Sequence, residues 1–227
     1  MSVVNPLAPL CKKLGHSFRD ESLLNRALTH RSVGSANNER LEFLGDSILN
    51  MVIAEALFLR RPDFSEGELS RMRANLVRGE TLAEIGGEIG LSEYLKLGQG
   101  ELKSGGFERN SIVSDCVEAL IGAIYLDAEF ATCRASVLGL YRSRLDNLPD
   151  AESLKDPKTR LQEYLQASGH DLPQYTVIAK EGKSHEQQFV VSCDVAVLDL
   201  HAEAKALGRR RAEQAAAAQV LANIGIE

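Results

Sequence analysis

Three carboxylates fall within eight residues of one predicted helix, and this spacing limits what the chain can fold into. The segment reads Asn-Glu-Arg-Leu-Glu-Phe-Leu-Gly-Asp over residues 38–46. At about 100° per residue, Glu39, Glu42 and Asp46 lie within about 60° of arc. The opposite face gathers the apolar side chains Leu41, Leu44, Ile48 and Val52. The pattern predicts an amphipathic helix with a core side and an acidic side.

A second acidic pair occurs in the apolar segment 111–123. Asp115 and Glu118 have the i, i+3 spacing that points both carboxylates the same way on a helix. Two such helices offer several oxygen ligands, which suit hard divalent cations such as Mg²⁺. Because these ions hold phosphates and activate water, metal-assisted phosphodiester chemistry is the leading hypothesis.

A solvated helix face is the alternative interpretation of each acidic cluster, because acids opposite an apolar stripe are common on surface helices. Two features count against it here. Phe43 falls on the acidic side of the first helix, and the segment 41–56 is too apolar for a freely exposed helix. Taken alone, the two clusters leave both interpretations open.

Longer stretches around these acids match a known pattern. His-Arg-Ser at residues 30–32 precedes the segment 38–47, which carries the first acidic cluster. Further matching stretches follow in order at residues 66–67, 70–77, 98–106 and 115–123. The series resembles bacterial ribonuclease III, an endonuclease that cleaves double-stranded RNA. The resemblance runs from about residue 5 to the C-terminus.

The resemblance implies a set of metal ligands. Glu42, Asp46, Asp115 and Glu118 match the residues that bind the catalytic Mg²⁺, for which Mn²⁺ can substitute. Asp46 and Glu118 match catalytic residues, and the loss of Glu118 is expected to impair cleavage most. No Ser, Cys or His nucleophile is implied, because the attacking group is a metal-activated water. The expected products carry 5′-phosphate and 3′-hydroxyl ends.

Three neighbours have weaker assignments. Glu39 and Glu66 match accessory acids that are thought to engage RNA or a second metal. Asn38 lies beside this set, and two roles remain open for it: a site residue, or a residue that caps the N-terminus of the helix. The resemblance also indicates ribosomal RNA precursors and structured messenger or regulatory duplexes as substrates.

The composition is that of an ordinary globular protein. With 227 residues and 44% hydrophobic content, the chain suits one large or two modest domains. There is no basic-then-apolar leader, and the longest apolar stretch, 117–126, is too short to span a membrane. We therefore expect a cytoplasmic protein with no membrane partner. The four cysteines show no zinc or disulfide spacing and are predicted to be small buried hydrophobes.

The net charge of −6 is unusual for a protein that binds a polyanion. Neither half of the chain is basic overall, so the position of the charges matters more than their sum. Much of the acidity in the first half belongs to the proposed metal site, where bound cations would offset it. The second half carries three adjacent arginines, Arg209, Arg210 and Arg211.

The pattern changes at a polar, proline-containing stretch around residues 146–153. Before it the periodicity is helical throughout. After it the sequence predicts helix, three strands and helix, at residues 157–165, 175–180, 188–194, 196–204 and 209–223. This order resembles a double-stranded-RNA-binding domain. The predicted fold is an all-α endonuclease domain (1–148), a linker (149–154) and a small α+β, α-β-β-β-α domain (155–227).

Domains of this kind read the shape of A-form RNA through 2′-hydroxyls and phosphates. Gln162, Glu163 and His185 match minor-groove contacts. Arg209, Arg210 and Arg211 fall at the start of the last helix, where backbone N–H groups also favour phosphate, although all three cannot face RNA. Ala206 and Gly208 depart from the residues that the family often has there, Gly and Ser.

The glycine-rich segment 98–106 lacks the pattern and the preceding strand of a nucleotide-binding loop. We expect a flexible connection between helices and no nucleotide cofactor. Phe43 has a separate interpretation, since a large aromatic side chain on a polar helix face needs a covering surface. The resemblance implies that a second copy supplies it, as a twofold homodimer in which each site cuts one strand and leaves a short 3′ overhang.

Two other classes of function remain in view. A catalytically silent double-stranded-RNA-binding protein would have a broken acidic set, and here all six acids are present. An unrelated helical interaction protein would lack the RNA-binding second half, which is also present. The sequence therefore favours an endoribonuclease specific for double-stranded RNA.

Overall fold

The structure is a computed structural model that describes residues 6–149, 155–182 and 187–226. It divides into two compact units, Met1–Ala151 and Glu152–Glu227. No helix in the described ranges is both long enough and apolar enough to cross a lipid bilayer.

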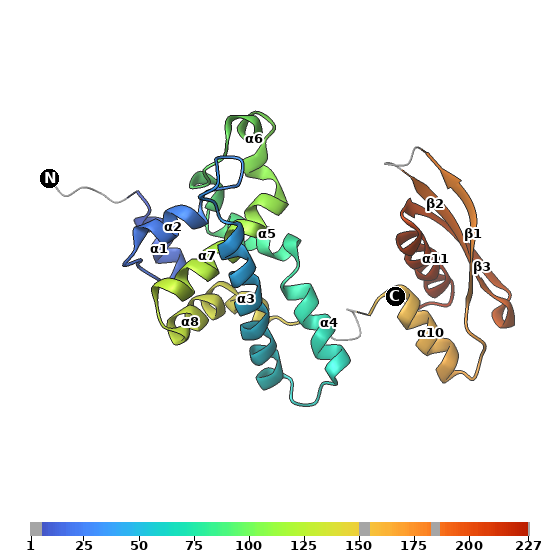
Figure 1. Cartoon of the computed structure of the whole chain (residues 1–227). Helices are drawn as coiled ribbons and strands as arrows, with labels where there is room; N and C mark the ends of the chain where they lie inside the picture. Colours follow the sequence, from blue (N-terminus) through green and yellow to red (C-terminus); the bar gives the residue numbers. More distant parts are fainter. Residues whose placement is uncertain (1–5, 150–154, 183–186, 227) are drawn as a thin grey trace. The chain divides into compact units, whose positions relative to one another are not determined.

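The first unit is helical in its described residues, as predicted (Figure 1). Its helices are α1 (Ala8–Leu14), α2 (Glu21–Ala27), α3 (Glu39–Arg60), α4 (Glu66–Leu76), α5 (Gly79–Glu88), α6 (Gln99–Lys103), α7 (Asn110–Asp127), α8 (Phe130–Leu140) and α9 (Arg142–Asp146). Two short 3₁₀ turns, η1 (Leu91–Glu93) and η2 (Gly106–Glu108), complete it. The glycine-rich segment 98–106, expected to be a flexible connection, instead contains helix α6.

Helix α7 forms the centre of this unit, because it is apolar around most of its circumference and is buried from Ile112 to Ile124 except at its acids. Helices α2, α3, α5 and α8 pack against it. The contact with α3 is the closest, since a Cβ on Gly122 would lie 2.2 Å from the carbonyl oxygen of Leu41. Only glycine allows the two backbones to approach in this way.

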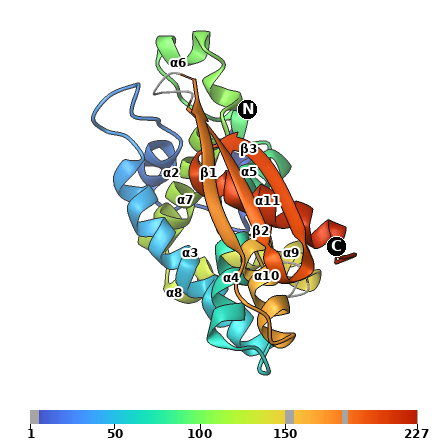
Figure 2. The ribbon, with the colours of Figure 1, turned by 90° about the vertical axis from the view of Figure 1, so that its right-hand side faces the viewer.

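The second unit has the predicted order of elements. Helix α10 (Pro157–Ala167) precedes the strands β1 (Gln174–Glu181), β2 (Gln188–Val195) and β3 (Leu200–Leu207), and α11 (Arg209–Asn223) ends it. The three strands form an antiparallel sheet in the order β1-β2-β3. Figure 2 shows α11 lying across one face of this sheet. Leu161 and Leu165 of α10 pack with Val220 of α11 against that face.

Two expectations need correction. The third strand was predicted from residue 196, but Ala196–Leu198 forms a 3₁₀ turn and β3 begins at Leu200. The chain reverses there through Asp199, whose φ of 51° lies in the left-handed region that Asp tolerates better than most residues. The cysteines are buried as predicted except for Cys11, which is only partly buried.

Candidate active site and RNA-binding surface

Helices α3 and α7 bring four carboxylates together. Glu42 and Asp46 project from α3, and Asp115 and Glu118 from α7. The two helices approach closely at these residues, since a Cβ on Gly45 would lie 1.8 Å from the carbonyl oxygen of Glu118. The pKa of Glu118 is raised to about 8. Burial is the main cause, and the negative charges of Asp46, Glu42 and Asp115 add to it. The residues that the sequence singled out as metal ligands thus form one electrostatic cluster.

Two other members of the cluster have raised pKa values as well. Burial raises the pKa of Glu42, and the charges of Asp115 and Glu39 raise it further. Burial also raises the pKa of Asp115, while a contact with Ser114 and nearby positive charge act in the opposite direction. These shifts show that the site concentrates negative charge in partly dry surroundings.

The charge of this cluster has little internal compensation. In the described part of the chain, no Lys or Arg forms an ion pair with Glu42, Asp46, Asp115 or Glu118. Asp46 accepts a hydrogen bond from Asn50 Nδ2 at 2.8 Å. Closely spaced carboxylates without a cationic partner are what a divalent cation would neutralise.

The four carboxylates offer hard oxygen donors, the ligand type that Mg²⁺ prefers. Among the described residues, no three His, Cys, Asp or Glu side chains are already arranged as a metal-binding group. Mg²⁺ does not require such an arrangement, because it keeps several waters and takes only one or two carboxylates directly. Hard oxygen donors with raised pKa values therefore fit a hydrated divalent cation.

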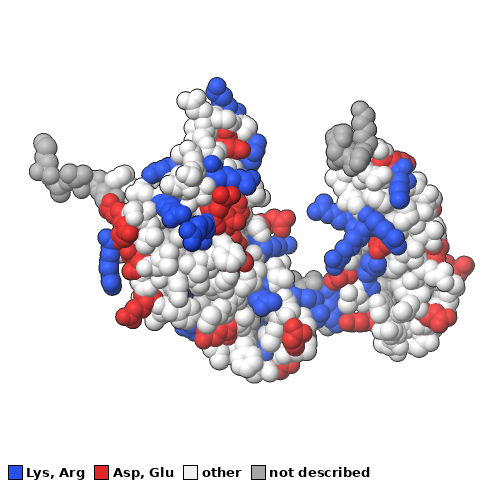
Figure 3. All heavy atoms as spheres, in the orientation of Figure 1, with Lys and Arg blue, Asp and Glu red and all other residues white. Residues whose placement is uncertain are grey.

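A hollow of about 280 Å³ adjoins the cluster at the start of α3. Glu42 and Asp115 form part of its wall, and Glu39, the first residue of α3, lies on its rim beside Arg31 at 3.6 Å. Arg109 also lines the hollow and pairs with Glu101 at 3.0 Å. Figure 3 shows acidic side chains bordered by basic ones on this part of the first unit. The site thus combines a negative centre with a basic margin.

Asn38 and His30 also line this hollow and are both buried. Of the two roles left open for Asn38, capping is met only in position, because Asn38 is the N-cap residue of α3 but its side chain makes no capping hydrogen bond. Asn37 does so instead, since its Oδ1 accepts a hydrogen bond from the backbone N–H of Glu39 at 3.1 Å. Helical periodicity could not reveal His30 or Asn38 as lining residues, because both precede the helix.

Five of the six predicted RNA-binding residues of the second unit lie on α10 and α11, namely Gln162, Glu163, Arg209, Arg210 and Arg211. Gln162 lines a hollow of about 580 Å³ together with Lys158, Arg209 and Arg210. Glu163 accepts a hydrogen bond from Lys155 Nζ at 2.6 Å. His185, the expected minor-groove contact between β1 and β2, lies outside the described residues.

Each of the three arginines has different surroundings. Arg209, Arg210 and Arg211 are exposed and open helix α11, as predicted. Arg209 Nε donates to Glu213 at 2.7 Å, so part of its charge is already neutralised. Arg210 and Arg211 form no ion pair with any described residue. These two are better suited to meet phosphate groups.

Comparison with known proteins agrees with this arrangement. The family described as Ribonuclease-III-like matches residues 20–145, and the double-stranded RNA binding motif matches residues 157–224. The chain is 57% identical over 217 residues to the Ribonuclease 3 of Vibrio campbellii, with 96% of each chain covered. It is 56% identical over 216 residues to that of Vibrio cholerae, with 95% of this chain and 96% of the relative covered. The chain belongs to the ribonuclease III family.

Solved structures of the ribonuclease III family show the same helical unit. Two structures of the nuclease domain of ribonuclease III from Campylobacter jejuni align with TM-scores of 0.60 and 0.61, at 40% and 39% identity. They cover 62% and 64% of this chain and 99% and 100% of their own. One of them is described as showing structural flexibility in a region involved in dimer formation of that protein.

Glu66 is the one predicted acid of this ribonuclease III relative that lies apart from the others. It opens α4 and accepts a hydrogen bond from Ser70 Oγ at 2.7 Å. It borders a different, mostly apolar hollow of about 620 Å³, which Phe58 and Phe64 also line. Within one chain, Glu66 therefore does not join the acidic cluster.

Phe43 projects away from the core of the nuclease unit, with 78% of its surface exposed. Met51 and Phe58 of α3 are also exposed and lie within about 80° of Phe43 around the helix, whereas the exposed Leu59 lies on another side. An apolar helix face of this kind is typical of a protein interface. The aromatic side chain that the sequence singled out thus belongs to a larger exposed apolar surface.

Proposed function

We propose that this member of the ribonuclease III family hydrolyses phosphodiester bonds of double-stranded RNA with Mg²⁺ held by Glu42, Asp46, Asp115 and Glu118. The observation that carries the proposal is the cluster of these four carboxylates on α3 and α7, with no Lys or Arg paired to it in the described residues. Mn²⁺ has the same preference for oxygen ligands and would serve in its place.

The four carboxylates would bind and orient the ion between the two helices. When bound, Mg²⁺ supplies an activated water and offsets negative charge on the leaving oxygen. The raised pKa of Glu118 means that this side chain holds a proton near neutral pH when no cation is present. Ion binding would displace that proton. In-line attack would leave a 5′-phosphate on one product and a 3′-hydroxyl on the other.

The second unit would supply most of the affinity for the duplex. Gln162 and Glu163 on α10 would meet the minor groove, and the exposed Arg210 and Arg211 would meet phosphates. His185 is proposed to contribute on the basis of its sequence position alone. Such contacts read A-form shape more than base sequence, so the proposed substrates are structured RNAs in the cytoplasm, including ribosomal RNA precursors and messenger or regulatory duplexes.

We assign the exposed apolar face of α3 to contact with a second copy of the chain. Phe43 is too exposed for an isolated protomer, and the apolar hollow beside Phe58 and Phe64 offers a surface of matching chemistry. In a twofold dimer, two acidic clusters would each cut one strand and leave a short 3′ overhang. A dimer would also allow Glu66, which is remote within one chain, to serve as an accessory acid for the partner.

The test is a cleavage assay on a perfect RNA duplex with wild type and Glu118→Gln, each with Mg²⁺ and with Ca²⁺, beside a gel-shift assay of binding. Gln keeps the shape of Glu and removes its charge. Wild type is expected to cut with Mg²⁺, while Glu118→Gln binds equally well and does not cut. Glu129→Gln, at an exposed position, is the matched control and should cut like wild type.

A silent RNA-binding protein would give a different result. Wild type and both variants would then bind the duplex, and none would cut it under any of the metal conditions. In that case the acidic cluster would require an explanation through folding or assembly.

A further inference from the structure

The hollow at the start of α3 contains two buried donors that the proposed metal chemistry does not use. Asn38 is 2% exposed, and its Nδ2 has no hydrogen-bond acceptor among the described residues. A buried donor without an acceptor is costly to the folded state and is rare in native proteins. Because Asn38 lines the hollow, an acceptor brought by a ligand would satisfy it.

His30 presents a second donor to the same hollow. Its Nδ1 accepts a hydrogen bond from the backbone N–H of Ser32 at 3.2 Å and lies 2.8 Å from Ser32 Oγ. This bond places the proton of the neutral ring on Nε2. In the described part of the chain Nε2 has no hydrogen-bond partner, and the side chain is nearly buried against the hollow.

The charges of the hollow indicate what kind of ligand it would take. Its lining includes the carboxylates of Glu39, Glu42 and Asp115. The two guanidiniums on its rim are already engaged, Arg31 with Glu39 and Arg109 with Glu101. An anion would therefore be repelled, whereas a hydroxyl group suits a site that has both donors and acceptors.

An RNA duplex carries one such group on every nucleotide, the ribose 2′-hydroxyl, and DNA lacks it. We infer that this hollow binds the 2′-hydroxyl of a nucleotide near the cleaved bond, with Asn38 Nδ2 and His30 Nε2 donating hydrogen bonds to it and the carboxylate of Glu39 accepting one from it. The inference rests on the proposed function, because the hollow adjoins the acidic cluster at Glu42 and Asp115. It assigns part of the selectivity for RNA over DNA to the nuclease unit.

The test couples one protein group to one ligand group. A duplex with a single defined cut would carry one 2′-deoxynucleotide at each position in turn around the cut. Wild type and Asn38→Ala would be compared by kcat/KM with Mg²⁺ and by Kd with Ca²⁺. At one position, the deoxy substitution should weaken wild type tenfold or more, since each lost hydrogen bond contributes about 1 kcal/mol. The same substitution should weaken Asn38→Ala by a clearly smaller factor, because only the bonds with His30 and Glu39 are then left to lose.

Asn37 supplies a matched control. It is the same residue type one position earlier and is also buried, but its Nδ2 donates to Gly34 O at 3.0 Å and to Glu39 Oε2 at 3.2 Å. Asn37→Ala should therefore melt at a lower temperature than wild type and should respond to the deoxy scan as wild type does. Asn38→Ala should melt no lower than wild type, because its Nδ2 has no acceptor to lose among the described residues.

Two outcomes would overturn the inference. In the first, each deoxy substitution affects wild type and Asn38→Ala by the same factor at every position. In the second, a methylphosphonate at one phosphate weakens wild type but not Asn38→Ala, while the deoxy substitutions affect both proteins alike. The hollow would then hold a phosphate. If wild type fails to cut the all-ribose duplex, the proposed function fails, and the Kd values with Ca²⁺ still decide the inference.

Discussion

A Cβ on Gly45 would lie 1.8 Å from the carbonyl oxygen of Glu118, so no side chain fits at residue 45 while α3 and α7 keep their positions. The same close approach sets Glu42 and Asp46 beside Asp115 and Glu118. The glycine in the middle of the acidic segment is therefore as much a part of the site as the carboxylates, because it fixes how far apart the two acidic pairs stand.

Gly45→Ala should separate the two helices and lose both stability and cleavage. Overpacking of this severity is expected to lower the free energy of unfolding by about 3 kcal/mol. A displacement of about 1 Å at the acids would reduce kcat about 100-fold. Denaturant unfolding and single-turnover cleavage would measure the two effects.

Gly87→Ala is the control for Gly45→Ala. Gly87 also lies in a helix, but a Cβ there would meet no atom within 4 Å. Alanine favours a helix over glycine, so this variant should be as stable as wild type or more stable and should cut normally. Wild-type stability in Gly45→Ala would mean that α3 and α7 do not approach as closely as described.

Stability without metal should fall as the pH rises. Glutamate titrates near 4.5 when unperturbed, whereas the pKa of Glu118 in the folded chain is about 8. Between these values the folded state binds more protons than the unfolded state, so the free energy of unfolding decreases with increasing pH. In EDTA, the melting temperature should drop by several degrees from pH 5 to pH 8.5, at about 2–4 °C per kcal/mol.

Mg²⁺ and the Glu118→Gln substitution should each remove this pH dependence of the melting temperature. Mg²⁺ would neutralise the cluster and raise the melting temperature most at high pH, where the carboxylates are charged. Glu118→Gln should raise the melting temperature in EDTA at pH 8 and flatten its pH dependence. If Glu118→Gln shows the same pH dependence of the melting temperature in EDTA as wild type, the charge that destabilises the folded state at high pH does not lie in this cluster.

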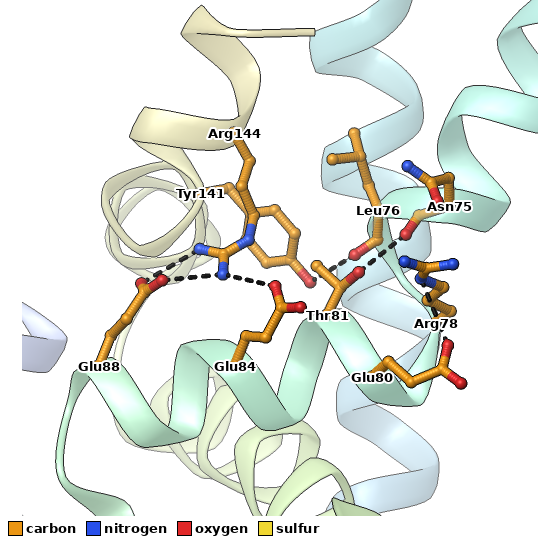
Figure 4. Close-up of polar contacts among 9 residues, drawn as sticks. All are labelled: Asn75, Leu76, Arg78, Glu80, Thr81, Glu84, Glu88, Tyr141 and Arg144. Atoms are coloured by element: carbon orange, nitrogen blue, oxygen red, sulfur yellow. Dashed lines mark hydrogen bonds and ion pairs between the residues drawn. The ribbon is translucent and has the colours of Figure 1, made fainter. Parts of the chain in front are cut away.

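A buried tyrosine hydroxyl at the end of α4 allows a test of the packing in the nuclease unit. Tyr141 is fully buried, and its hydroxyl donates to the carbonyl oxygen of Leu76 at 3.2 Å (Figure 4). Tyr141→Phe should cost about 1–2 kcal/mol, because it leaves that carbonyl unpaired in the interior. Tyr125→Phe, at a partly exposed position, should cost much less in the same unfolding experiment.

Near Tyr141, an ion-pair cluster links α9 to α5 at the surface. Arg144 donates to Glu88 at 2.8 and 3.1 Å and to Glu84 at 3.1 Å, which ties α9 to α5 (Figure 4). Both glutamates are well exposed, so their charges are screened by water and the bonds contribute little individually.

The tyrosine comparison has a clear contrary outcome. If Tyr141→Phe and Tyr125→Phe lower the free energy of unfolding equally, the buried hydroxyl of Tyr141 adds nothing to stability.

Much of this molecule could be predicted from its sequence because its signals are local. The i, i+3 and i, i+4 spacing of the acids already determined that they share helix faces, and α11 begins at the predicted Arg209. Apolar periodicity likewise indicated the helical unit. The family resemblance supplied the pairing of the two acidic helices, which spacing alone could not give.

Other features depend on tertiary contacts and left no local signal. Ala196–Leu198 has the apolar composition of a strand, yet the chain must reverse before β3, and a turn through Asp199 achieves this. Asn38 occupies the N-cap position of α3, but the side-chain bond to the first helical N–H comes from Asn37 in the preceding loop. Glu66 matches a site residue in sequence, and only the fold shows that α4 starts away from the cluster.

The salt dependence of RNA binding should distinguish the arginines of α11. Each phosphate contact that is lost lowers the slope of log Kd against log salt by about 1. Arg210→Ala should show this loss, since Arg210 is exposed and forms no ion pair with a described residue. Lys205→Ala, on β3, removes the same charge from a residue already paired with Glu181 and serves as the control.

Arg209→Ala should behave differently, because its guanidinium already binds Glu213. Its removal leaves the largely buried carboxylate of Glu213 with Lys158 as its remaining ion-pair partner among the described residues, so this variant should lose stability as well as affinity. Its change in salt slope should be smaller than that of Arg210→Ala. If Arg209→Ala and Arg210→Ala have the same salt slope and the same melting temperature, the bond between Arg209 and Glu213 does not affect RNA binding or stability. Both arginines would then contact phosphate equally.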